Sequence, residues 1–196
     1  VMTFQACRIK EGQRLFTNSG CAAMGYGFPA AIGAAIARKG KQVVCIDGDG
    51  SFQMNLQELQ TVVYNRLNIK IIYLNNDGYH SIRQTQTNLF KGEPLVGVCD
   101  GNGLSFPDME KIAYAYGIPY VRIDHLEMAS KQLKDVLHQD GPMIIEAVLD
   151  SEQNFEPKLS SKVLPDGRIV SPALDDMYPF LNPKEYEEIH RSCREL

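Results

Sequence analysis

Residues 43–51 read VVCIDGDGS, and this stretch decides the fold class. Residues 43–47 form a short, mostly apolar and β-branched run that ends at a glycine turn, which is typical of a strand. Such runs mark strands buried on both faces, as in parallel sheets. The stretch therefore predicts a buried strand that leads directly into a tight turn at Gly48–Ser51.

Three further segments show the same strand pattern, namely 69–74 (IKIIYL), 119–123 (PYVRI) and 143–149 (MIIEAVL). Helical patterns lie between or before the strands, at 29–39, 53–66, 107–116 and 128–138. Pro29 suits a first helical position, and Gly40 suits a helix stop. The alternation predicts an α/β fold, a doubly wound and mostly parallel sheet with helices on both faces.

The rhythm stops near Asp150, so we expect an α/β domain over 1–150 and a separate C-terminal region over 151–196. Residues 151–181 contain four prolines and show no steady period, but they carry too many apolar side chains for free disorder. They indicate an ordered tail that wraps the domain, or a linker. A final helix is expected from Asn182, with Asn182 as cap, Pro183 at the first position and Glu185 as the acid of a capping box.

The bulk composition excludes several classes of protein. The 196 residues are 44% hydrophobic with a net charge of -4, and no Lys/Arg block is visible, which argues against nucleic acid as a partner. No apolar run approaches the roughly 20 residues needed to span a bilayer, so we expect no membrane partner. The five scattered cysteines favour neither a disulfide framework nor a zinc site, and indicate a reducing cytoplasm.

The turn at Gly48–Ser51 is a candidate phosphate site because it lies between a predicted strand and a predicted helix. Backbone N–H groups at a helix start favour anions, glycines allow close approach, and Ser51 can add a hydroxyl donor. An ordinary tight turn with a helix cap is the alternative. A dinucleotide fingerprint or a P-loop is not supported, since neither GxGxxG nor a Gly-Lys-Ser/Thr ending is present here.

A second polar turn, Asn75–Gly78, follows the next predicted strand. One helix and one strand fit between the two turns, so Asp49 and Asn76 are expected near each other at one sheet edge. A carboxylate oxygen, an amide oxygen and the Gly78 carbonyl are hard ligands suited to Mg²⁺, which usually also bridges phosphate oxygens. The pair of turns therefore predicts a metal-bridged diphosphate, whereas the second turn alone could be a plain β-turn.

At this point the sequence resembles a known family. Gly48-Asp49-Gly50, a spacer in the mid-twenties and Asn75-Asn76 match the thiamine diphosphate motif. The resemblance implies thiamine diphosphate and Mg²⁺ as cofactors, with Asp49, Asn76 and the Gly78 carbonyl as metal ligands. It also implies cofactor contacts at Gly48, Gly50, Ser51, Asn76, Gly78 and Tyr79.

Residues 19–34 are similar to the segment before the first helix in acetolactate synthase large subunits, where it lies against the aminopyrimidine ring. The resemblance implies ring contacts from Ala22, Ala23 and Met24, with Met24 as the bulky side chain that props the cofactor into its bent shape. The family usually has glycines and a threonine where Cys21, Ala22 and Ala23 stand. A core methionine is the alternative role for Met24.

Residues 152–161 and 171–177 resemble the C-terminal end of acetolactate-synthase-like proteins. The implied reaction is decarboxylation of a 2-ketoacid such as pyruvate and ligation to a second carbonyl, in branched-chain amino acid biosynthesis. Acetolactate synthases usually carry a tryptophan where Thr85 stands, so the substrates stay open. Another thiamine-dependent decarboxylase or lyase, or a non-catalytic phosphate-binding module, is the alternative. His80 is either a candidate proton carrier or a residue of the turn. Arg83 is a candidate partner for a substrate carboxylate or for an acid on the protein surface.

The resemblance places the activating glutamate on a separate pyrimidine domain, so no catalytic residue is expected within these 196 residues. It also implies that the active site forms with the pyrimidine domain of a second subunit, hence a homo-oligomer. FAD is possible in the full-length enzyme. We therefore expect the isolated chain to bind cofactor weakly and to turn over no substrate.

Overall fold

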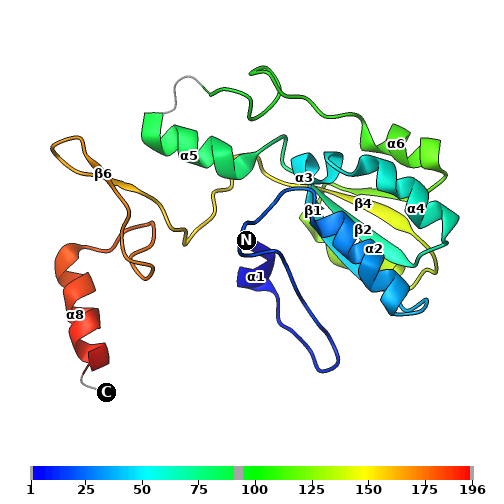
Figure 1. Cartoon of the computed structure of the whole chain (residues 1–196), viewed down its shortest axis with the longest axis horizontal. Coiled ribbons are helices and arrows are strands. Elements are labelled where there is room, and N and C mark those ends of the chain that lie inside the picture. Colours follow the sequence, from blue (N-terminus) through cyan, green and yellow to red (C-terminus); the bar gives the residue numbers. More distant parts are fainter. Residues whose placement is uncertain (1, 91–94, 195–196) are drawn as a thin grey trace. The chain divides into compact units, whose positions relative to one another are not determined.

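The computed structural model describes residues 2–90 and 95–194 (Figure 1). Contacts divide them into two compact units, which we describe separately. The larger unit comprises the described residues within 9–80 and 95–153, and the smaller unit those within 1–8, 81–94 and 154–196. The expected division into 1–150 and 151–196 stays a prediction, although the contacts group residues 81–90 with the C-terminal region. The ends of the two predicted ranges, 1 and 196, lie outside the described residues.

The larger unit is built on a four-stranded sheet in the order β1-β2-β4-β3, in which every pairing is parallel. The strands are β1 (Val43–Gly48), β2 (Ile69–Asn75), β3 (Tyr120–Ile123) and β4 (Met143–Val148). The register aligns Cys45 with Ile71 and Ile71 with Ile144. All four predicted strands are confirmed, because short apolar runs of this kind need burial on both faces.

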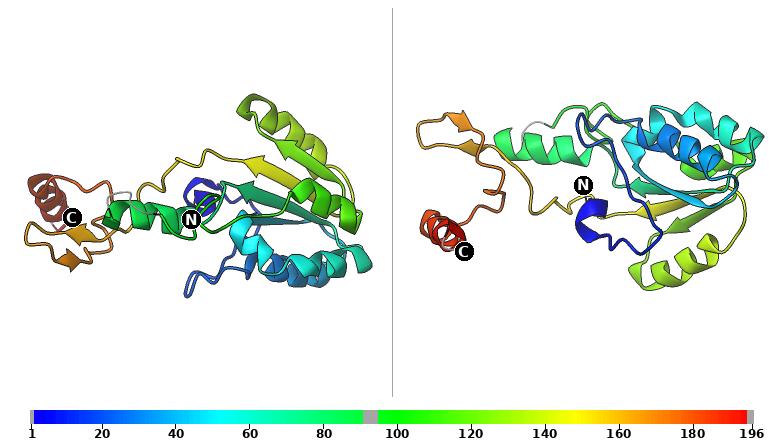
Figure 2. Two further views of the ribbon diagram at one scale, coloured as in Figure 1. Left: turned by 90° about the horizontal axis from the view of Figure 1, so that it is seen from above. Right: turned by 60° about the horizontal axis from the view of Figure 1, so that its bottom comes forward.

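Helices cover both faces of this sheet, as Figure 2 shows with α7 opposite α2 and α4. One hydrophobic core joins β1, β2 and β4 to α2 (Gly27–Ala37), α3 (Asp49–Gln53), α4 (Leu59–Tyr64) and α6 (Met109–Tyr116). A second core packs Val136 of α7 (Leu126–Leu137) against Ile123 and Ile145. The predicted doubly wound α/β class is confirmed.

Two helices differ from the prediction. The helix expected over 29–39 begins at Gly27, two residues before Pro29, where the start of the helix lies against the Asp47 carboxylate. The helix expected over 53–66 is interrupted and forms α3, a short 3₁₀ turn η1 (Leu56–Glu58) and α4. The break lies at Asn55, whose φ of −134° leaves the helical region and whose side chain binds the Gly25 carbonyl.

The smaller unit contains α1 (Met2–Ala6), most of α5 (His80–Phe90), β5 (Lys162–Val163), β6 (Ile169–Val170) and α8 (Pro183–Arg194). The antiparallel hairpin β5–β6 gives the predicted tail regular structure. Asn182 caps α8 as expected, since its Oδ1 accepts the Lys184 N–H at 3.0 Å. That the tail wraps the domain stays a prediction. In the described part of the chain, no helix has the length and apolar character needed to cross a bilayer.

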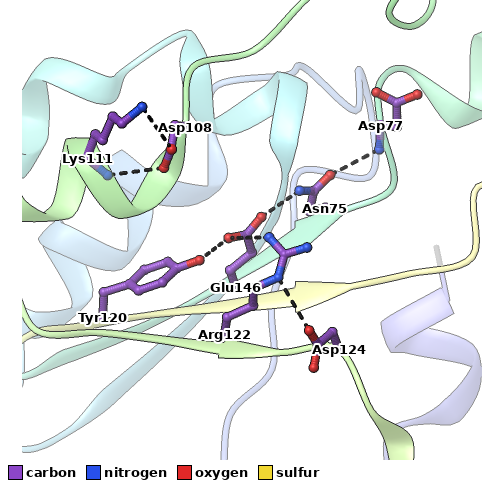
Figure 3. Close-up of polar contacts among 8 residues, drawn as sticks. All are labelled: Asn75, Asp77, Asp108, Lys111, Tyr120, Arg122, Asp124 and Glu146. Atoms are coloured by element: carbon purple, nitrogen blue, oxygen red, sulfur yellow. Dashed lines mark hydrogen bonds and ion pairs between the residues drawn. The ribbon is translucent and has the colours of Figure 1, made fainter.

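Asp108 caps α6, and its Oδ1 accepts the Lys111 N–H at 3.2 Å (Figure 3). This hydrogen bond lowers the pKa of Asp108 below its ordinary 3.8. A depressed pKa adds stability above the unfolded value, and that stability is lost as the pH falls through the folded value. We expect wild type to unfold at a higher urea concentration than Asp108→Asn at pH 6, and the gap to close as the pH falls below 3.8, because Asn caps equally well without charge. Asp135→Asn, in the exposed part of α7, is the charge-matched control; a gap that persists at low pH would contradict the assignment.

Candidate metal and cofactor site

The sheet brings the two polar turns together at one edge. Gly48 ends β1 and pairs with Leu74 of the neighbouring strand β2, so both strands deliver their following turns to the same place. Asp49 then opens α3, and Asn76 follows the last residue of β2. The predicted neighbourhood of Asp49 and Asn76 is therefore present in the fold.

The Asp49 carboxylate is the centre of this edge and is only 2% exposed. Its Oδ1 accepts the Gly50 N–H at 2.7 Å. Its Oδ2 accepts the N–H groups of Asn76 at 3.2 Å and of Gly78 at 2.9 Å. Burial raises the pKa of Asp49, and these three N–H groups partly oppose that rise. The result is a buried carboxylate that would be stabilised further by a cation.

The side-chain amide of Asn76 and the carbonyl of Gly78 lie beside this carboxylate. The end of the Asn76 side chain lies 3.0 Å from the Gly78 carbonyl oxygen and 3.2 Å from Asp49 Oδ2. Without a cation, the amide would gain hydrogen bonds by turning its nitrogen to that position. With a hard cation between them, the three oxygens become a carboxylate, an amide and a carbonyl ligand, the set that suits Mg²⁺. The residues present therefore fit the predicted metal.

The turn at Gly78 requires glycine. Its φ is +125°, and a Cβ at this position would lie 1.9 Å from the backbone oxygen of Val98. The same Val98 oxygen accepts the Tyr79 N–H at 2.8 Å, which fixes the next residue of the turn. The Gly78 oxygen accepts the His80 N–H at 3.0 Å and keeps a second lone pair for a metal.

Gly50 and Tyr79, both predicted diphosphate contacts, lie against each other. A Cβ on Gly50 would meet the Tyr79 ring at 2.0 Å, so only glycine permits this approach. The outer side of the ring packs edge-on against Phe106, with centroids 6.0 Å apart. The aromatic ring thus joins the first turn to the second.

The Ser51 hydroxyl is bonded within the protein, and its predicted cofactor contact stays a prediction. Its oxygen accepts the Gly25 N–H at 2.9 Å, and its hydrogen serves the Asp47 carboxylate. The hydroxyl is therefore engaged within the protein, and the backbone N–H in the first turn of α3 is the group of Ser51 that remains suited to a phosphate.

The segment before α2 is held by residues that the sequence did not single out. Asn55 Nδ2 donates to the Gly25 carbonyl at 2.6 Å, while Ser51 binds the Gly25 N–H. Ala22 adopts a left-handed φ of +48°, and Met24 is 44% exposed, so the alternative of a core methionine is wrong. The predicted ring contacts of Ala22, Ala23 and Met24 stay predictions.

Three residues of α5 were discussed from the sequence for roles at the substrate, namely His80, Arg83 and Thr85. His80, at the end of the turn, is buried and 5% exposed, which excludes the solvent-facing alternative. Arg83 is also buried, so it is not a surface partner of an acid. Thr85 is exposed, and its hydroxyl donates to the Ser81 carbonyl at 2.9 Å within the helix.

Other metal sites and disulfides find no support over 2–90 and 95–194. No group of three His, Cys, Asp or Glu residues could hold a metal ion in those ranges. All five cysteines are free thiols, as their scattered positions predicted. A metal at this edge therefore depends on the mixed set of Asp49, Asn76 and Gly78 oxygens.

Comparison with known families adds the deciding observation. Residues 1–147 match the family described as thiamine pyrophosphate enzyme, C-terminal TPP binding domain. The chain belongs to this family. It is also similar to whole enzymes: it is 34% identical over 160 residues to acetolactate synthase 2, chloroplastic, of Nicotiana tabacum, covering 80% of this chain and 24% of that protein.

Two bacterial relatives show the same pattern. Acetolactate synthase isozyme 2 large subunit of Escherichia coli (strain K12) is 37% identical over 145 residues, covering 74% of this chain and 26% of the relative. Acetolactate synthase large subunit of Lactococcus lactis subsp. lactis (strain IL1403) is 32% identical over 160 residues, covering 82% of this chain and 27% of the relative. This TPP-binding domain thus spans about a quarter of the length of the curated relatives it matches. The resemblance stated from the motifs is confirmed.

Proposed function

We propose that this TPP-binding domain holds the magnesium–diphosphate end of thiamine diphosphate for an acetolactate synthase-like reaction. The observation that carries the proposal is the meeting of the Asp49 carboxylate, the Asn76 amide and the Gly78 carbonyl at one edge of a parallel sheet. Each group belongs to a segment that follows a strand, so the sheet holds the three groups close together before the metal arrives.

The remaining polar groups of the two turns suit the diphosphate. The diphosphate would lie against Gly48, Gly50, Ser51 and Tyr79, where the N–H groups of Gly50 and Tyr79 donate to Asp49 and Val98 and the Ser51 N–H stands in the first turn of α3. Met24, being exposed, is available to support the rings. Bound thiamine diphosphate supplies the carbon chemistry, which in such enzymes is decarboxylation of a 2-ketoacid and transfer of the fragment to a second carbonyl. The residues of this domain would bind thiamine diphosphate and orient it.

The proposal extends to the partners of this domain. An activating glutamate from a pyrimidine domain of a second subunit would complete the active site, which makes the assembly a homo-oligomer. Pyruvate or a similar 2-ketoacid would be the substrate, within cytoplasmic branched-chain amino acid biosynthesis, and FAD would bind outside these residues if it is used. The 196 residues alone would hold cofactor weakly and release no CO₂ from pyruvate.

A second candidate reaction is kept by one observation. Thr85 occupies the position at which the family resemblance leads us to expect a tryptophan, and the chain has no tryptophan. A smaller, polar residue there would change the shape of an acceptor pocket. Another thiamine-dependent decarboxylation or ligation of a 2-ketoacid would therefore use the same metal site.

Calorimetric titration of thiamine diphosphate into the whole chain tests the proposal. We expect binding heat in the presence of excess Mg²⁺ and none with EDTA, because the three protein oxygens hold the diphosphate only through a metal. Inorganic pyrophosphate with Mg²⁺ should compete, and unphosphorylated thiamine should not.

The controls separate this function from a general phosphate module. ADP with Mg²⁺ should bind at least about tenfold more weakly than thiamine diphosphate, a difference of about 1.4 kcal/mol. Equal binding of the two ligands would favour a non-catalytic phosphate-binding module. Binding of thiamine diphosphate that is unchanged by EDTA would contradict the metal site itself.

A further inference from the structure

The strand β4 carries a buried charge that the metal site does not use directly. Glu146 lies in the middle of β4, is 4% exposed, and pairs in register with Tyr73 of β2 and Arg122 of β3. A carboxylate buried in a sheet is costly unless it is paired and hydrogen-bonded. Its neighbours in the sequence, Ile145 and Ala147, are apolar, so the charge of Glu146 is not explained by the pattern of the strand.

Three side chains satisfy this carboxylate (Figure 3). Asn75 Nδ2 donates to Glu146 Oε1 at 2.5 Å, and the Tyr120 hydroxyl donates to Oε2. Arg122 Nη1 lies 3.5 Å from Oε2, and its Nε lies 3.6 Å from Asp124. Burial and the Glu146 carboxylate raise the pKa of Tyr120, so its hydroxyl keeps its proton and stays a donor. The Glu146 carboxylate is therefore fixed from three sides.

The bond to Asn75 reaches the metal turn. Because Glu146 can only accept from the Asn75 amide, the nitrogen of that amide must face Glu146 and its oxygen must face away. That oxygen accepts the Asp77 N–H at 3.2 Å. The contacts thus run without interruption from Glu146 through the Asn75 side chain to the backbone between two predicted metal ligands, Asn76 and Gly78.

The turn needs this support because its backbone is unfavourable. Asp77 has a left-handed φ of +58°, which costs a non-glycine residue about 1 kcal/mol or more when nothing holds it. The N–H groups of Asn76 and Gly78 bind Asp49, and the N–H between them, from Asp77, binds Asn75. All three successive N–H groups therefore donate to side-chain oxygens. Glu146 orients the Asn75 amide, which accepts the middle N–H.

We propose that Glu146 is a positioning residue for the metal site and acts through Asn75. By orienting the Asn75 amide, Glu146 holds the Asp77 N–H, and this places the Asn76 amide and the Gly78 carbonyl beside Asp49. The proposal rests on the proposed function for its metal and cofactor, whereas the contacts themselves belong to the free protein.

A double-mutant cycle on the whole chain tests the proposal. The measured quantity is the Mg²⁺ concentration that gives half-maximal binding of thiamine diphosphate. Glu146→Leu and Asn75→Ala should each raise it about tenfold, the usual cost of losing an outer-shell partner of a metal ligand. Because both act through one contact, the double variant should also show about tenfold, not the roughly hundredfold expected of independent sites.

Two further variants give the controls. Glu146→Gln keeps an acceptor for the Asn75 amide and should stay close to the wild-type Mg²⁺ requirement. Ile145→Val trims a fully buried neighbour on β4 whose side chain lies in the other core, and it should leave the Mg²⁺ requirement unchanged. A double variant with multiplied effects, or Glu146→Leu with wild-type Mg²⁺ dependence, would overturn the proposal.

Amide hydrogen exchange of Asp77 provides a measurement that needs no cofactor. Exchange should be faster in Asn75→Ala and in Glu146→Asp, which keeps the charge but shortens the reach and serves if Glu146→Leu does not fold. Unchanged exchange in both variants would overturn the relay. If wild type binds no thiamine diphosphate at all, the proposed function fails, while the exchange measurement still decides whether Glu146 holds the turn.

Discussion

We expect Asp49→Ala to abolish Mg²⁺-dependent binding of thiamine diphosphate and to leave the chain folded. Asp49 is the only charged member of the three proposed metal ligands, and its Oδ2 lies 3.2 Å from the Asn76 amide. We expect a loss of at least about a hundredfold in affinity, since losing an outer-shell partner alone costs ten- to a hundredfold. Calorimetric titration with saturating Mg²⁺ measures this loss.

The fold should survive because two effects of the change oppose each other. Removing the Asp49 carboxylate removes the cost of burying its charge, the same burial that raises its pKa. The change also removes the acceptor of the N–H groups of Gly50, Asn76 and Gly78. The far-UV circular dichroism spectrum should therefore match wild type. Asp135→Ala, which removes the same charge from the exposed part of α7, should bind normally. Undiminished binding by Asp49→Ala would refute the metal assignment.

Gly78→Ala should be the most destabilising single change at the site. The new Cβ would lie 1.9 Å from the Val98 backbone oxygen, and the φ of +125° is strained for any side chain. Overpacking and an unfavourable backbone each cost about 1–3 kcal/mol, so we expect a loss of about 3–5 kcal/mol in the free energy of unfolding. Urea denaturation followed by circular dichroism measures it.

The control for Gly78→Ala separates crowding from backbone strain. Gly103 has a similar φ of +103°, but a Cβ there would meet no atom within 4 Å. Gly103→Ala should therefore cost only the strain, about 1–3 kcal/mol. Equal losses in the two variants would show that Val98 does not crowd residue 78.

The strands and the neighbourhood of the two turns could be predicted because they depend on local patterns. The runs 43–47 and 69–74 are apolar and β-branched, and two strands that are adjacent and parallel must deliver their following turns to one edge. Asp49 and Asn76 are therefore close for a reason that is visible in the order of the residues.

The parts that sequence reasoning missed depend on contacts between distant residues. The break at Asn55 comes from a bond to Gly25, thirty positions away, which no periodicity contains. The bond between the Ser51 hydroxyl and the Gly25 N–H spans 26 positions and is likewise absent from any local pattern. Helix α5 was not predicted because its sequence, HSIRQTQTNLF, is mainly polar and lacks a clear apolar stripe.

Glu146 left a signal in the sequence that could have been followed. A single acid inside the apolar run MIIEAVL is unusual for a strand buried on both faces. The pattern indicates a buried charge, but it does not identify the partners of that charge, because Asn75, Tyr120 and Arg122 belong to two other strands. Register, and not composition, decides which side chains meet it.

Among the described residues, β1 stands at one edge of the four-stranded sheet and pairs with β2 alone. Edge strands are the first to fray, and their unpaired backbone groups invite association with other chains. Here the edge strand is also the support of Asp49, so fraying would pull one ligand away from the other two. A ligand that binds only the intact arrangement stabilises it by mass action, by about 2.7 kcal/mol at a hundredfold excess over its dissociation constant. Binding of the proposed cofactor would therefore also hold this edge of the sheet together, and the described fold should resist unfolding longer when metal and cofactor are both supplied.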